Sequence, residues 1–356
     1  MASGMKRMAG LSLLVLGVAY LSSPKAEAGL LGNAVIRGKI TGQIGGAAAQ
    51  PISGAKVLVE IDGVVGSKDA TIQFFGSHQI VYTASDGTYQ ATVGIPDDIP
   101  INHLIFRVRA AKLSGPTIYG AMEARGGLSP GIFTYQANLT LQGLTYGAFI
   151  SGTIRSQETG QRMRGAGVQA RRPNPASGGT NTTTYAQVTD GDADFFGVIQ
   201  MNGAAEVQSV SADTNDLPYL VDTSPDGLAY NTGLKWVTLN SGKLHTVNVD
   251  LTRDATRPSI VGRVIDGSTG KPRPHVVVRL TNGVASYSVT DELGRYALPV
   301  QFPVSYPIIV ETTGTFLDPD DRFSGPPSPY WTDRVNLSGR LQDGQVFQLD
   351  LSMVRK

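Results

Sequence analysis

Three acidic residues alternate along one short stretch of the chain, at Asp190, Asp192 and Asp194. Carboxylate oxygens spaced in this way can converge on calcium, as they do in the first half of an EF-hand loop. The glycine and glutamate that would complete such a loop do not follow. Aspartate is also common in ordinary hairpin turns, where it accepts local hydrogen bonds. We therefore interpret the stretch as a turn and keep a calcium site formed by these three aspartates as the alternative hypothesis.

Aromatic residues form a second candidate site. Tyr330 and Trp331 end a proline-rich stretch, and Trp236 and Tyr230 lie in a comparable part of the preceding sequence. An exposed tryptophan or tyrosine can stack on sugar rings or anchor a partner protein. Rings of this size also often pack loops over the edge of a fold, and we favour that interpretation. Tyr330, Trp331 and Trp236 remain the candidate binding residues.

Catalytic motifs are not found in the sequence. The four histidines have no second histidine or glutamate at a metal-ligand spacing. A G-x-S-x-G nucleophile motif is missing, and a chain without cysteine cannot use a cysteine nucleophile. The segment 267–271 resembles a phosphate loop only superficially, because it lacks the first glycine and Pro272 replaces the serine or threonine. We expect no enzymatic activity and no organic cofactor.

The composition favours short strands joined by turns. The 356 residues include 43 glycines and 20 prolines, and β-branched residues are common. The 30 basic and 29 acidic side chains nearly cancel, so the chain has no electrostatic signature of a nucleic-acid partner. Without cysteine, an exported protein must be stabilised by its hydrophobic cores alone.

The N-terminal segment has the features of a signal peptide. Two basic residues at 6–7 precede an apolar run over 8–21, and Ala26 and Ala28 provide the small residues of a cleavage site before Gly29. The apolar run is shorter than the roughly 20 residues that span a bilayer. We expect a soluble mature chain, without a transmembrane segment, that is secreted, extracellular or attached to the cell surface. A periplasmic location would also fit.

Alternating apolar and polar residues predict strands throughout the remaining sequence. The segment 259–298 predicts four strands joined by turns, and a looser version of this pattern occurs twice earlier. The same threonine, glycine and aromatic residue recur at one spacing, as Thr83, Gly87, Tyr89 and as Thr290, Gly294, Tyr296. In the middle copy we align Thr189, Asp194 and Phe196, which makes that turn one residue longer.

These repeats predict an all-β protein. The expected limits are 1–28 for the signal peptide and 29–142, 143–255 and 256–356 for three β-sandwich repeats. The linkers are short, which predicts a semi-rigid rod. The segment 29–34 is a candidate arm that could add a strand to another molecule.

The third repeat resembles the carboxypeptidase regulatory-like domain, which is related to the Cna-B-type repeats of surface proteins. The resemblance is carried by Arg263-Val264-Ile265-Asp266, Gly270-Lys271-Pro272, Val276-Val277-Val278, Thr290-Asp291, Gly294 and Tyr296. It implies three tandem transthyretin-like Greek-key β-sandwich domains. It indicates little about function, because such domains accompany many unrelated proteins. The lysine–asparagine crosslink of some Cna-B-type domains is not expected, since alternation puts Lys39 on the solvent face.

The sequence therefore predicts an exported, non-enzymatic structural or adhesive protein, which would serve as a spacer or as a subunit of a surface assembly. Its expected partners are other surface or extracellular proteins, including further copies of itself, and polysaccharide. The alternative function is carbohydrate binding through the exposed aromatic residues.

Overall fold

The structure is a computed structural model that describes residues 30–66, 71–96, 101–163, 165–173, 182–190, 192–213, 230–274, 276–281, 285–290, 293–300, 308–315, 330–331 and 333–355. The predicted signal peptide lies outside the described residues. The described chain is all β apart from one short 3₁₀ helix, η1 (Ile101–His103). No helix among these residues is long and apolar enough to cross a membrane.

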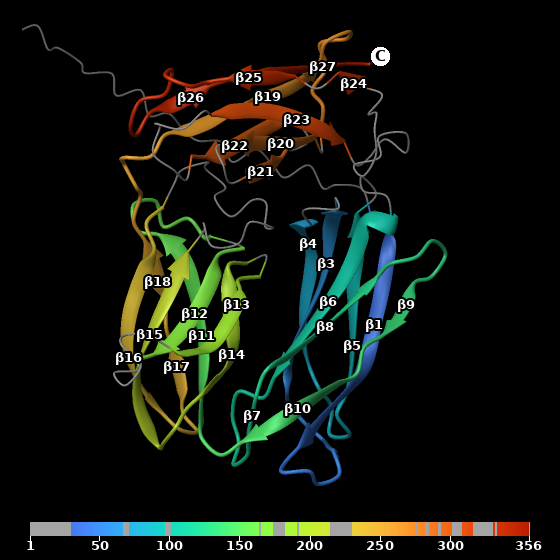
Figure 1. Cartoon of the computed structure of the whole chain (residues 1–356). Coiled ribbons are helices and arrows are strands. Elements are labelled where there is room, and N and C mark those ends of the chain that lie inside the picture. Colours follow the sequence, from blue (N-terminus) through green and yellow to red (C-terminus); the bar gives the residue numbers. More distant parts are fainter. Residues whose placement is uncertain are drawn as a thin grey trace, which may run out of the picture.

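The strands form six sheets that pair in chain order, and we name the pairs the N-terminal, central and C-terminal sandwiches (Figure 1). The N-terminal sandwich has one sheet of β1 (Leu30–Gln43), β2 (Gln50–Pro51), β5 (Thr88–Pro96), β7 (Ile118–Tyr119), β9 (Thr134–Gln136) and β10 (Leu139–Leu144). Its second sheet has the order β4 (Thr71–Tyr82), β3 (Lys56–Gly66), β6 (Leu104–Ala111) and β8 (Met122–Gly127).

The other two sandwiches follow the same plan. The first central sheet contains β11 (Gly147–Ser156), β14 (Asp194–Gln200), β17 (Leu244–Thr246) and β18 (Val249–Leu251), and the second has the order β13 (Thr182–Val188), β12 (Gly167–Arg172), β15 (Ala205–Asp213), β16 (Gly233–Asn240). The first C-terminal sheet contains β19 (Ser259–Asp266), β22 (Arg295–Pro299), β24 (Tyr330–Trp331), β26 (Val346–Gln348) and β27 (Leu351–Arg355), and the second has the order β21 (Ala285–Val289), β20 (Val276–Thr281), β23 (Ile309–Thr315), β25 (Arg334–Asn336).

A glycine allows the close crossing at the middle of each first strand. β1 pairs in parallel first with β9 and then with β10, and the chain between these two strands passes over Gly38. A Cβ on Gly38 would lie 1.8 Å from the carbonyl oxygen of Ala137, and Gly152 and Gly262 are equally close to the corresponding carbonyls. The side chain of Asn138 then accepts a hydrogen bond from the backbone N–H of Lys39 at 2.8 Å. Lys39 itself is exposed, as the alternation predicts.

A buried threonine joins two loop segments in every sandwich. The Thr83 hydroxyl donates to the carbonyl of Ile52 at 2.6 Å and accepts from the N–H of Ala55 at 2.8 Å. Thr189 and Thr290 make the same pair of bonds in their own sandwiches. Three copies of one local geometry therefore follow from three copies of one residue.

The predicted register of the central turn is wrong by one residue. Ala193, with φ of 64°, occupies the position of Gly87 (φ 80°) and Gly294 (φ 69°). Phe195 packs against Gly152 as Tyr89 packs against Gly38, so the spacing equals that of the other copies. The error arose because the left-handed position, which glycine usually occupies, carries an alanine here. Phe195 therefore lies in the central core, and Phe196, which the alignment had matched to Tyr89 and Tyr296, lies on the opposite face of the sheet.

Each sandwich has its own apolar core, formed by the facing sides of its two sheets. The N-terminal core includes Ile36, Val57 and Val108, and the central core includes Ile150 and Val210. A third cluster fills the C-terminal sandwich. The predicted domain limits remain predictions.

The sandwiches are packed together and do not form the extended rod that we expected. Figure 1 shows the N-terminal and central sandwiches side by side, with the C-terminal sandwich lying across one end of both. The rod prediction failed because it considered only linker length and ignored the apolar outer faces, whose burial favours docking. The segment 30–34 is also not a free arm, since Leu30–Gln43 forms β1 and pairs with β5 from Leu30 onward.

Candidate functional site

The junction between the N-terminal and central sandwiches is the most chemically elaborate part of the described chain. Its apolar part is centred on Phe196 of β14, which packs against Leu58 and Ala111 from the outer face of the N-terminal sheet. The ammonium group of Lys56 lies 4.3 Å from the centroid of the Phe196 ring, a cation–π distance. A second apolar cluster joins Ile118 of β7 to the central sandwich. Alternation along β14 thus presents residues to the core and to the junction in turn.

A buried ionic group lies beside these apolar contacts. Arg107 of β6 has 1% of its side chain exposed, and its Nη2 lies 2.6 Å from Oε2 of Glu60 and 3.4 Å from Oδ2 of Asp62. Both carboxylates, on β3, are at most 2% exposed. Glu60 and Arg107 are directly opposite each other in the β3–β6 ladder, so the sheet register itself brings them together.

Burial and charge act in opposite directions on this group. Burial raises the pKa of Glu60, and Arg107 only partly offsets that effect. Burial alone would lower the pKa of Arg107, but Glu60 and Asp62 outweigh it, so its pKa is raised and the guanidinium stays charged. Such a group is costly to bury and more costly to break, because the remaining charge would have no partner.

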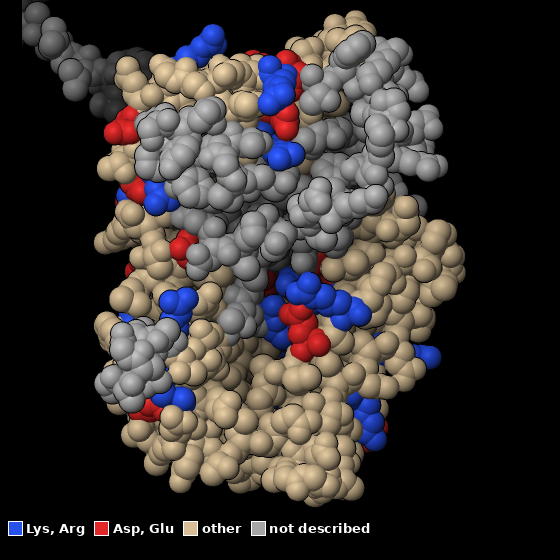
Figure 2. Space-filling view, viewed as in Figure 1, with Lys and Arg blue, Asp and Glu red and all other residues tan. Residues whose placement is uncertain are grey.

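The ionic network continues toward the edge of the same sheet. Glu123 of β8 accepts from Nη2 of Arg109 at 3.1 Å and from Nε of Arg125 at 2.6 Å. Burial raises the pKa of Glu123, but the two arginines more than compensate and hold it below its usual value. Arg109 is nearly buried whereas Arg125 is exposed, so the network runs from the junction to solvent. Figure 2 shows acidic and basic side chains gathered where these two sandwiches meet.

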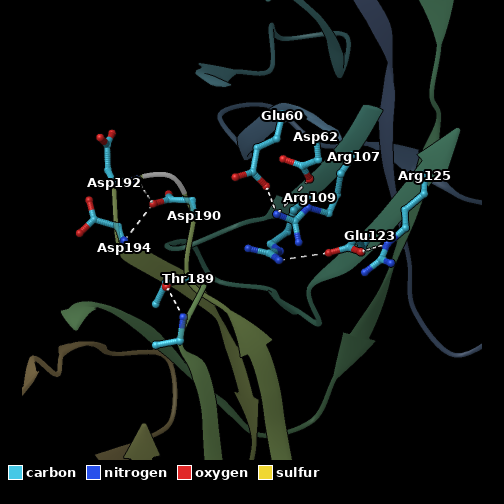
Figure 3. A network of polar contacts seen from close by, with 11 residues as sticks. Glu60, Asp62, Arg107, Arg109, Glu123, Arg125, Thr189, Asp190, Asp192 and Asp194 are labelled. Atoms are coloured by element: carbon cyan, nitrogen blue, oxygen red, sulfur yellow. Dashed lines mark hydrogen bonds and ion pairs between the residues drawn. The ribbon is translucent and has the colours of Figure 1, made fainter. Parts of the chain in front are cut away.

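The predicted aspartate cluster lies on the other side of this junction (Figure 3). Asp190 is fully buried, and its Oδ1 accepts the backbone N–H groups of Asp192 at 3.0 Å and Asp194 at 2.9 Å. Its Oδ2 has no hydrogen-bond partner among the described residues. Burial, assisted by the charge of Glu60 across the junction, raises the pKa of Asp190 to about 6. Figure 3 shows the Glu60 carboxyl pointing toward this turn.

The three aspartates do not converge on a common point. Asp192 pairs with Nε2 of His78 at 2.8 Å, which links the central turn to β4. Asp194 accepts from the hydroxyl of Thr153 at 2.5 Å and lies 3.6 Å from Arg162. Within the described part of the chain, no group of three or more histidine or acidic side chains could hold a metal ion. The calcium hypothesis therefore rests on sequence spacing alone.

The aromatic candidates lie in different environments. Trp236 of β16 is 57% exposed, whereas Tyr230 is buried. Tyr330 and Trp331 form β24, which pairs with β27, but their side chains lie outside the described set. The structure thus leaves Trp236 as the candidate whose exposure is established.

Sequence reasoning missed the buried ionic group. Glu60 and Asp62 alternate with apolar residues along β3, a pattern that predicts a solvated outer face. The unusual signal was that Arg107 and Arg109 alternate in the same way along β6, so two oppositely charged strands could be neighbours. Without the fold, nothing in the sequence indicated that another sandwich covers this face.

No protein-family model matches the sequence, and neither does any curated protein. Among solved structures, the Bacillus anthracis TIE protein is similar at 11% identity with a TM-score of 0.25, over 90% of this chain and 51% of the TIE protein. The chain therefore spans about half the length of the TIE protein. A streptococcal ancillary pilin is similar at 11% identity with a TM-score of 0.24, over 91% and 99% of the two chains. The shaft pilin SpaA from Lactobacillus rhamnosus GG shares 11% identity at a TM-score of 0.21, over 62% and 97%. Because these TM-scores are low, function is argued below from the residues alone.

Proposed function

We propose that the chain is an exported, non-enzymatic structural protein, a subunit of a cell-surface or extracellular assembly. In this proposal residues 1–28 are removed as a signal peptide, and three domains with limits near 29–142, 143–255 and 256–356 form one rigid unit. The signal-like N-terminus, the recurring threonine turns and the separate apolar cores support these features.

The observation that carries the proposal is that the charged side chains at the junction form ion pairs with one another. Glu60, Asp62 and Arg107 compensate one another in a buried position, and Glu123 is held between Arg109 and Arg125. Groups that serve in acid–base catalysis must reach a substrate. Here Glu60, Asp62 and Arg107 pair with one another within one sheet and are at most 2% exposed, and the ion pair that crosses the junction is His78–Asp192. Such an arrangement suits a protein that transmits load or positions surfaces.

Contacts to the C-terminal sandwich support the same rigid unit. Arg253 is held in the central segment by the hydrogen bond from its N–H to Glu158 at 2.9 Å, and its Nη2 donates to the carbonyl of Gly344 in the C-terminal segment at 3.3 Å. Val277, on the outer face of β20, belongs to the apolar cluster of the N-terminal sandwich. A rigid block offers constant spacing between any two binding surfaces on it.

Sizing and imaging of residues 29–356 test the proposal. We expect light scattering to detect oligomers whose mass rises with protein concentration, and negative-stain electron microscopy to detect ordered assemblies. A chain that stays monomeric at every concentration and forms no assemblies would contradict the structural-subunit proposal. Screening for hydrolase activity is the matched check on its non-enzymatic part, and any turnover would refute that part.

Carbohydrate binding is a second candidate, and the exposure of Trp236 is the observation that favours it. A flat indole on a sheet surface can stack on a pyranose ring. A polysaccharide pull-down should then retain the wild-type chain and lose the Trp236→Ala variant. Trp331→Ala is the parallel variant for the second aromatic pair. Equal retention of all three proteins would exclude aromatic stacking at these positions.

A further inference from the structure

We propose that the exposed edge of β16 is the contact through which one copy of this chain pairs with a second copy, by antiparallel strand addition. The inference rests on the proposed function, since it names the partner of a self-assembling subunit. It is carried by three observations: one side of the strand has no partner strand among the described residues, the strand has exposed apolar side chains, and its sequence can pair with itself.

β16 has one neighbour among the described strands. It pairs antiparallel with β15 from Gly233 to Asn240, in a register without a bulge, and it is the last strand of its sheet. Ser241 donates its N–H to Ala204 at 2.8 Å just beyond the ladder, and the N–H of Asn240 donates elsewhere, to His245 at 3.0 Å.

The alternation of an antiparallel ladder fixes which backbone groups remain on the open side. Since Ser241 hydrogen-bonds toward β15, residues at every second position before it do the same. The positions between them, Leu234, Trp236 and Thr238, then direct their N–H and C=O groups away from the sheet. Within the described part of the chain no strand pairs with these groups, and such a row can serve as a template for another strand.

The same three positions also carry the exposed side chains. Leu234 is 58% exposed and Trp236 is 57% exposed, and Val207, which lies opposite Thr238 on the same face, is 50% exposed. Leu234, Trp236 and the open backbone groups therefore lie on the edge strand, with Val207 beside them on β15. Pairing at this edge would give the backbone groups partners and bring a second set of side chains against Leu234 and Trp236.

The corresponding edges of the other sandwiches are protected. β8 carries Glu123 and Arg125 at the outward positions opposite Arg109 and Arg107. β25 is three residues long and carries Arg334, which lies 3.6 Å from Glu311. Charged residues and short length are the usual means by which natural sheets prevent edge pairing. β16 has eight residues and a single charged one, Lys235, so it lacks both protections.

The strand is complementary to a second copy of itself. A two-fold axis at Trp236 would place Trp236 opposite its counterpart and Leu234 opposite Thr238, all with backbone groups directed toward the partner. Lys235 would face Val237, so no like charges would be directly opposed. A saccharide could stack on the indole of Trp236, but it would leave Leu234 and the outward backbone groups without partners. A second copy of the strand provides partners for Trp236, Leu234 and these backbone groups together.

Single-cysteine variants of the mature chain provide the sharpest test, because the natural sequence contains no cysteine. Hydrogen-bonded partners in an antiparallel pair have Cα atoms about 5.5 Å apart, which is within reach of a disulfide. Trp236→Cys should therefore form a crosslinked dimer on mild oxidation or with a short thiol-reactive crosslinker. Thr238→Cys should not, because the two copies of that residue would be separated by four residues along the strand, about 14 Å. A mixture of Leu234→Cys and Thr238→Cys should crosslink again.

Charge and backbone variants test the same contact without crosslinking. Leu234→Lys and Thr238→Pro should each weaken self-association by about tenfold or more. Leu234→Lys removes an apolar cross-strand contact and introduces a charge. Thr238→Pro removes an outward backbone N–H that would donate to the partner strand. Ile44→Lys, at an apolar residue that is 52% exposed in a loop, is the matched control and should leave the association unchanged. Circular dichroism and the melting temperature would verify that each variant is folded. If one of the two edge variants proves misfolded, the other still tests the contact.

The outcomes separate this inference from the proposed function. If the wild-type chain assembles but the edge variants also assemble and Trp236→Cys does not crosslink, the β16 contact is wrong and the structural-subunit proposal stands. If the wild-type chain is monomeric under all conditions, both are wrong. Retention on polysaccharide that is lost in Trp236→Ala, in a chain that does not self-associate, would assign this face to a saccharide and overturn the second-copy contact.

Discussion

The buried arginine at the junction offers the most discriminating test of the structure. Arg107 compensates two carboxylates that are each at most 2% exposed. Replacing it by methionine preserves most of the side-chain volume and removes the charge, so the substitution leaves Glu60 and Asp62 buried without their partner. Removing one member of a buried ion pair typically destabilises a protein by about 3–5 kcal/mol. We expect Arg107→Met to destabilise the chain by that amount near pH 8.

The expected loss depends on pH in a definite direction. Burial already raises the pKa of Glu60, and loss of the Arg107 charge would raise this pKa further. A carboxyl whose folded-state pKa is raised destabilises the fold fully above that pKa and not at all below its unfolded value. The destabilisation by Arg107→Met should therefore be largest at pH 8 and become smaller as the pH falls toward 5. Adding Glu60→Met should recover part of the loss, because the two residues are coupled.

Urea unfolding followed by circular dichroism and by tryptophan fluorescence would measure the effect. With a slope of about 2 kcal/mol per molar urea for a domain-sized unit, the midpoint should fall by about 2 M. Arg125→Met is the matched control, since Arg125 binds Glu123 of the same network but is exposed, and its loss should change the free energy of unfolding by less than about 1 kcal/mol. Equal effects of the two variants, or a loss for Arg107→Met that is the same at pH 5 and pH 8, would refute the buried position of this group.

Three further outcomes are expected. Ala193→Gly should stabilise the chain by up to about 1 kcal/mol in thermal unfolding, because Ala193 has a positive φ. The reverse change, Gly294→Ala, should destabilise the chain by more than about 1 kcal/mol, because the new Cβ would lie 2.6 Å from the carbonyl oxygen of Val264. Asp190→Asn should stabilise the chain by about 2–3 kcal/mol at pH 8 and have little effect below pH ~4, because the folded-state pKa of Asp190 is raised from 3.8 to about 6. Equal gains in stability at both pH values would contradict this expectation. Thr290→Val should cost about 1–3 kcal/mol, since the buried N–H of Val276 loses its acceptor, and an unchanged melting temperature would argue against that hydrogen bond.

The sequence alone determined the local elements. Strands follow from alternation because successive side chains point to opposite faces, and Val35 to Ile40 of β1 behaves as this rule predicts. Turn positions follow from residues that tolerate positive φ, as Gly87 and Gly294 do. Where an alanine occupies that position, at residue 193, the rule failed by one residue, because the tertiary contacts around the turn held the strained conformation.

Which outer faces meet solvent was decided only by the tertiary structure. Alternation marks Glu60 and Arg107 as outward residues of a sheet, and it marks Leu234 and Trp236 in the same way. Docking of the central sandwich buries the first pair, whereas the second pair remains open to solvent. Periodicity reports only the two sides of a strand, because it arises from bonded neighbours. The burial of an outward side depends on segments more than a hundred residues away, which the local pattern does not encode.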